Sequence, residues 1–67
     1  MTVARVTEIS ATSTKSFDDA VRQGITRASK TLRNIKSAWV KEQNVMIDGS
    51  SISGFKVNLE ITFVLDD

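Results

Sequence analysis

The chain has 67 residues, which is enough for one small domain at most. It contains no cysteine and no histidine, which excludes disulfides, cysteine–histidine zinc sites and the usual general base at neutral pH. Nine basic and eight acidic residues give a net charge of +1, without the positive excess that is typical of a general nucleic-acid binder.

No apolar run is long enough to cross a membrane, and residues 1–9 lack the basic start and apolar run of a signal peptide. We therefore expect a cytoplasmic protein that binds neither nucleic acid nor membranes. Hydrophobic residues make up 40% of the chain, which is typical of a folded domain.

The first predicted element is a strand over Val3–Ile9, where β-branched residues alternate loosely with polar ones. The next segment, Ser10–Lys15, is short and polar, and we predict a loop there.

A helix is predicted from Phe17 to about Asn34. Ser16 is the candidate N-cap, and Asp19 follows three residues later, as in a capping box with Asp in place of Glu. Apolar or small residues recur at spacings of three and four and form one stripe: Phe17, Ala20, Val21, Gly24, Ile25, Ala28 and Leu32. Gly24 indicates that another element packs closely against the middle of this helix.

Four basic residues lie on the other positions of the predicted helix: Arg22, Arg27, Lys30 and Arg33. Their ordinary interpretation is a solvated face whose C-terminal members suit the helix dipole. A phosphate-bearing ligand is the alternative.

Two more strands are predicted, Ser37–Ile47 and Phe55–Leu65, joined by a turn at Asp48–Ser51. The Asp-Gly pair of this turn tolerates positive φ at low cost. The last strand alternates strictly between apolar and polar residues, so one of its faces must be buried.

The predicted fold class is α+β, with the order β-α-β-β and a three-stranded antiparallel sheet packed on one helix. The strand over Phe55–Leu65 is expected in the centre of the sheet. One helix and three strands make a thin core, and the sheet keeps two open edges. Both features favour a symmetric homo-oligomer.

No enzymatic site is predicted, because the glycines are isolated and no nucleophile motif is present. Glu42 and Glu60 lie on adjacent predicted strands, where we interpret them as surface charges paired with basic neighbours such as Lys41 and Lys56. No metal site is predicted either. Asp48 and the terminal pair Asp66–Asp67 do not form a calcium loop, although single carboxylates can meet at a symmetry axis.

Trp39 is the only tryptophan, and the alternation places it with Ser37, Lys41 and Gln43 on the strand face away from the helix. Ala38, Val40 and Met46 are expected on the core side. Trp39 either fills a subunit interface, where tryptophan is enriched, or stacks on a flat ligand.

The chain resembles the dodecin family over Val3–Leu65. The resemblance is carried by the Ser-Ala-Thr-Ser that follows the first strand, by the basic end of the helix over residues 27–35, by Ala38, Val40, Glu42 and Gln43, and by the closing strand over residues 55–63. Membership would imply a hollow, roughly spherical homododecamer that binds riboflavin, FMN or FAD without catalysis and stores them. In that family, paired flavins lie between strand tryptophans, and a glutamine binds the ring.

This sequence departs from the family pattern at both site positions. If Val40 and Gln43 keep the register, the stacking tryptophan falls on Ser37 and the glutamine falls on Lys56. A lysine donates hydrogen bonds but cannot accept them. The predicted flavin site is therefore Trp39 stacking, Lys56 donating and Ser37 lining the floor. The alternative is a structural or carrier assembly that binds a cation or another small ligand instead of flavin.

Overall fold

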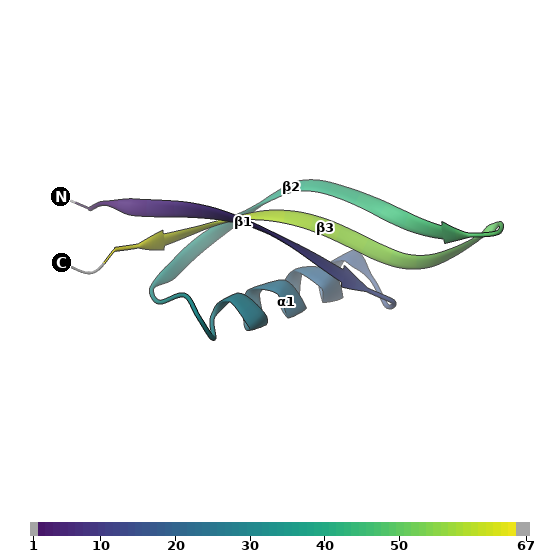
Figure 1. Cartoon of the computed structure of the whole chain (residues 1–67), viewed down its shortest axis with the longest axis horizontal. Helices are drawn as coiled ribbons and strands as arrows, with labels where there is room; N and C mark the ends of the chain where they lie inside the picture. The colour runs from purple at the N-terminus through teal and green to yellow at the C-terminus, as the bar shows by residue number, and fades with distance from the viewer. Residues whose placement is uncertain (1, 66–67) are drawn as a thin grey trace.

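The computed structural model describes residues 2–65 and confirms the β-α-β-β order. The elements are β1 (Ala4–Ser13), α1 (Phe17–Ala28), β2 (Ile35–Asp48) and β3 (Ser51–Val64). The strands form one sheet in the order β1-β3-β2, and both pairings are antiparallel. The helix lies across one face of the sheet (Figure 1).

The core lies between α1 and the central strand β3. Leu59, Ile61 and Val57 are fully buried, and they alternate with polar residues that point to the other face. From the helix, Ala20 and Ala28 complete the buried cluster. Strict alternation on β3 therefore sets two chemically distinct faces, as the period-two pattern predicted.

The start of α1 matches the prediction, whereas its end does not. The Asp19 amide donates to Ser16 Oγ at 3.0 Å, which confirms the N-cap. The helix ends at Ala28, about six residues before the predicted end. Asn34 then adopts a φ of +62°, and its carbonyl accepts from the Val64 amide at 3.0 Å. The chain leaves the helix early because it must reverse direction and pair with the end of β3.

All three strands are longer than predicted. Ser10–Ser13 was predicted as loop, but these residues pair with Phe55–Asn58 and extend β1. At the other end of the sheet, Gly49 opens a two-residue hairpin loop with a φ of +66°, as the Asp-Gly signal indicated. Long strands make the chain an elongated body of 51 × 19 × 13 Å. The start of β1 and the end of β3 lie at one end, and the hairpin projects beyond the helix at the other (Figure 1).

The helix packs on β1 and β3 and leaves much of β2 uncovered. Ala38 and Val40 pair with Ile61 and Leu59 on the helix side, as predicted, but Val40 is still 46% exposed. The prediction that Met46 lies on the core side is wrong, because a register shift between Val40 and Glu42 reverses the alternation. Met46 pairs with Gly54, which shares the β3 face of Asn58 and Glu60, and it is 42% exposed on the side away from the helix. Within residues 2–65, no helix is long and apolar enough to span a bilayer.

Candidate functional site

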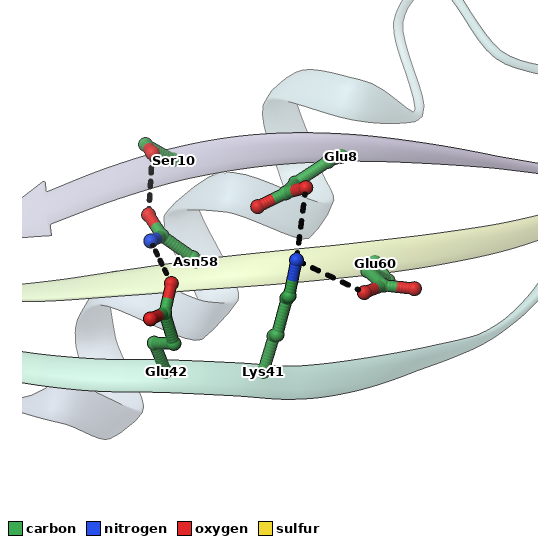
Figure 2. A network of polar contacts seen from close by, with 6 residues as sticks. All are labelled: Glu8, Ser10, Lys41, Glu42, Asn58 and Glu60. Atoms are coloured by element: carbon green, nitrogen blue, oxygen red, sulfur yellow. Dashed lines mark hydrogen bonds and ion pairs between the residues drawn. The ribbon is translucent and has the colours of Figure 1, made fainter.

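The polar face of the sheet carries the candidate site. Asn58 and Glu60 of β3 alternate with the buried Leu59, so they point away from the helix. Figure 2 shows side chains of all three strands meeting there, with α1 behind the sheet. Two networks of polar side chains cross the centre of this face from β1 to β2.

A β-bulge between Val40 and Glu42 shapes this face. Val40 pairs with Leu59 and Glu42 pairs with Asn58, which leaves Lys41 as the extra residue on β2. The alternation therefore shifts by one position, so that Glu42 joins the polar face. The prediction that Gln43 shares a face with Trp39 is wrong, because Gln43 pairs with the buried Val57.

Lys41 forms the first polar group with two glutamates. Its Nζ atom lies 3.5 Å from Glu8 Oε1 and 3.6 Å from Glu60 Oε1 (Figure 2). The charge of Glu8, its hydrogen bond and the charge of Glu60 raise the pKa of Lys41 above its usual value. The three side chains remain partly exposed to solvent, so this is a surface network that joins β1, β2 and β3.

The second polar group runs across the sheet one step further along. Ser10 Oγ donates to Asn58 Oδ1 at 2.6 Å, and Asn58 Nδ2 donates to Glu42 Oε1 at 2.8 Å (Figure 2). The prediction that both glutamates pair with basic neighbours is confirmed for Glu60, which pairs with Lys41, but not for Glu42, whose partner is the Asn58 amide. Their separation into two groups gives no acid–base pair.

Trp39 lies beside the first polar group. It pairs with Glu60 on the face away from the helix, as predicted, and it is 72% exposed. Trp39, Val40, Lys41 and Glu60 line a shallow depression of about 300 Å³. Ser37 pairs with Thr62, the next polar-face residue of β3, so Ser37 and Trp39 are neighbours on one face.

Lys56 lies on the same face of the sheet as Trp39 and Ser37, but further along the strands towards the hairpin. It pairs with Asn44, four residues from Glu60 along β3, which corresponds to about 13 Å of strand. A single chain thus brings Trp39 and Ser37 together but keeps Lys56 apart from them. Among residues 2–65, Lys56 forms no ion pair with Glu42 or Glu60.

The four basic residues predicted on one helix do not all lie on it. Arg22 and Arg27 lie on α1, whereas Lys30 and Arg33 belong to the connection that follows it. Among residues 2–65, no three acidic side chains gather in a way that would hold a metal ion. Asp48 ends β2 at the tip of the hairpin, and Asp66–Asp67 lie outside the described residues.

From the sequence, Lys41 was predicted only as an ion-pair partner of a glutamate. Its position in the structure makes it a candidate functional residue. Strict alternation puts Lys41 on the polar face, but it gives no sign that a bulge lets Lys41 and Glu42 both reach that face. The available signal was that Lys41 and Glu42 are the only charged residues of the predicted strand over Ser37–Ile47.

Comparisons with known proteins agree on one family. The dodecin family model matches residues 3–66. A dodecin from Streptomyces davaonensis is 36% identical, with a TM-score of 0.94 over 98% of this chain and 97% of that one. A Thermus thermophilus dodecin, in a variant with a tryptophan changed to phenylalanine, is 30% identical over the full length of both chains, with a TM-score of 0.93.

A third relative differs in the ligand that its name gives. The calcium dodecin of Mycobacterium tuberculosis is 30% identical over 63 residues, which cover 94% of this chain and 89% of that protein. Its crystal structure, described as having a novel calcium-binding site, gives a TM-score of 0.83 over 96% of this chain and 91% of that one.

Proposed function

This chain belongs to the dodecin family, and we propose that it is a non-enzymatic, cytoplasmic ligand-binding oligomer whose preferred ligand is a flavin. The observation that carries this proposal is the exposure of Trp39, which is 72% accessible beside a depression on the polar face. An indole held open on a strand offers a flat apolar surface, on which an aromatic ring gains about 1 kcal/mol beyond area burial.

In this proposal, Trp39 stacks on the ring system, Ser37 lines the floor and Lys56 donates a hydrogen bond. Lys56 is about 13 Å away along the strand, so the ring either lies lengthwise along β3 or meets Lys56 of a second subunit. A lysine suits the carbonyl oxygens of a flavin, because an ammonium group only donates.

We propose a homododecamer as the functional form, on the strength of family membership and of the surface that one subunit leaves open. Ile47 and Ile52 of the hairpin are 66% and 58% exposed, and the helix side of β2 is not covered by α1. Apolar surface of this kind in a 67-residue chain favours burial against further copies.

A second candidate is an assembly of the same architecture that binds a cation or another small ligand and no flavin. The similarity to a relative named calcium dodecin favours it, and so do Ser37 and Lys56 at the two site positions. In that case, Trp39 packs against a neighbouring subunit.

Trp39→Ala separates these functions. If Trp39 stacks on the ligand, we expect Trp39→Ala to lose riboflavin binding while size-exclusion chromatography shows an unchanged oligomer. Trp39→Phe should retain weakened binding, because a smaller ring still stacks. Collapse of the oligomer in Trp39→Ala, or riboflavin binding at wild-type strength, would contradict the assignment.

A further inference from the structure

The two glutamates of the first polar group face each other directly. Glu8 of β1 and Glu60 of β3 are register partners in an antiparallel pair. Like charges directly opposite each other destabilise a sheet, so this position needs a positive charge. Two carboxylates at this spacing would otherwise attract a cation from solution.

Lys41 supplies that positive charge from β2. Its ammonium group lies at 3.5 Å from Glu8 Oε1 and 3.6 Å from Glu60 Oε1, and so is within ion-pair distance of both glutamates. It reaches this position from the bulge, which adds one residue to β2 opposite β3. Bulges commonly redirect a side chain beside a functional site, and this one lies in the wall of the Trp39 depression.

We propose that Lys41 is a specificity-determining residue that occupies the place of a cation between Glu8 and Glu60. The ammonium group closes this position to dissolved multivalent cations and leaves the Trp39 depression to an organic ring. This proposal rests on the ligand-binding role proposed above. It assigns to Lys41 the choice between a flavin and a cation.

The charges support this role. Two carboxylates and one ammonium group leave a local charge of −1, whereas loss of the ammonium leaves −2. The rise in the pKa of Lys41 has the same origin, since Glu8 and Glu60 stabilise its charged form. A multivalent cation entering beside Lys41 would be repelled by the ammonium charge at a distance of about 4 Å.

The test uses terbium as the probe, with the single Trp39 as its sensitiser. Lys41→Met keeps the side-chain length and removes the charge. We expect Lys41→Met to show saturable Trp39-sensitised terbium emission that calcium displaces, with an apparent affinity at least about tenfold above wild type. Lys41→Arg keeps the charge and should behave as wild type. Lys36→Met, a matched loss of a lysine charge on β2, should also not gain emission.

Lys41→Met combined with Glu60→Gln should lose the gained emission, which would tie it to this position. Equal terbium binding by wild type and Lys41→Met would overturn the proposal, as would Lys41→Met binding no better than Lys36→Met. The readout needs no flavin. A terbium gain in a protein that does not bind riboflavin would support the role of Lys41 while contradicting the proposed ligand.

Discussion

Asp19 ties the first turn of α1 to the end of β1. Its Oδ2 accepts hydrogen bonds from Ser13 Oγ and from Gln23 Nε2, each at 2.5 Å. Ser13 is buried and also accepts from the Lys15 amide at 2.9 Å, so the carboxylate anchors the strand–helix corner. The Ser13 hydrogen bond is the main cause that lowers the pKa of Asp19, aided by Gln23 and by the charges of Lys15 and Arg22.

Acid should therefore weaken the fold through Asp19. A carboxyl whose pKa is lower in the folded chain than in the unfolded one stabilises above the unfolded value of about 3.9. That stability is lost as the pH falls through the folded pKa. We expect Asp19→Asn to lower the free energy of unfolding at pH 7 and to differ less from wild type at pH 2, as measured by urea denaturation.

Asp18→Asn is the matched control, because Asp18 is an exposed carboxylate in the same helical turn. It should show a smaller difference at pH 7. A pH-independent gap between Asp19→Asn and wild type would contradict the account of Asp19.

The candidate site could be predicted only in part from single residues. The side on which Trp39 and Ser37 lie followed from alternation, because no bulge separates these two positions. Alternation failed at Gln43, since the inserted Lys41 shifts every later residue by one face. The distance from Trp39 to Lys56 also depends on register, which strand pairing sets and local sequence does not.

The helix illustrates which features of an element can be predicted from sequence. Its start was predictable because Ser16 and the acidic first turn act locally. Its end was not, because Ser29 and Lys30 are compatible with a helix and the chain leaves it to pair with β3. The extra length of β1 has the same cause, since Ser10–Ser13 become a strand through their pairing with β3.

Gly24 is a point of close packing between α1 and the sheet. A Cβ atom at this position would lie 3.1 Å from Ala11 Cβ and 3.1 Å from Leu59 Cδ1. Leu59 is fully buried and Ala11 sits on a paired strand, so neither can move away easily. Gly24→Ala should thus lose the usual gain of about 1 kcal/mol in helix propensity and destabilise the fold by about 1–3 kcal/mol.

The matched control is Thr26→Ala, at an exposed position two residues further along α1, which should be neutral or gain a few tenths of a kcal/mol. Urea denaturation of both variants measures the difference. A Gly24→Ala protein at least as stable as wild type would show that the helix is not held as tightly as these distances indicate.

At the scale of the whole molecule, the fold could be predicted because its main determinant is simple. Strict alternation on the central strand and one amphipathic helix specify two layers, and the Asp-Gly turn fixes the hairpin. The extent of exposed surface could not be predicted in the same way. Whether α1 covers β2 depends on where the helix ends and on the angle at which it crosses the sheet.

The central claim is that a dodecin-type chain with a displaced tryptophan still binds a flavin. A riboflavin titration of the purified wild-type protein, followed by ligand fluorescence, tests it most directly. We expect saturable quenching at no more than one flavin per chain, because a ring stacked on Trp39 loses its emission. No quenching at high micromolar protein would contradict the flavin assignment and leave the assembly with a cation or another small ligand as its cargo.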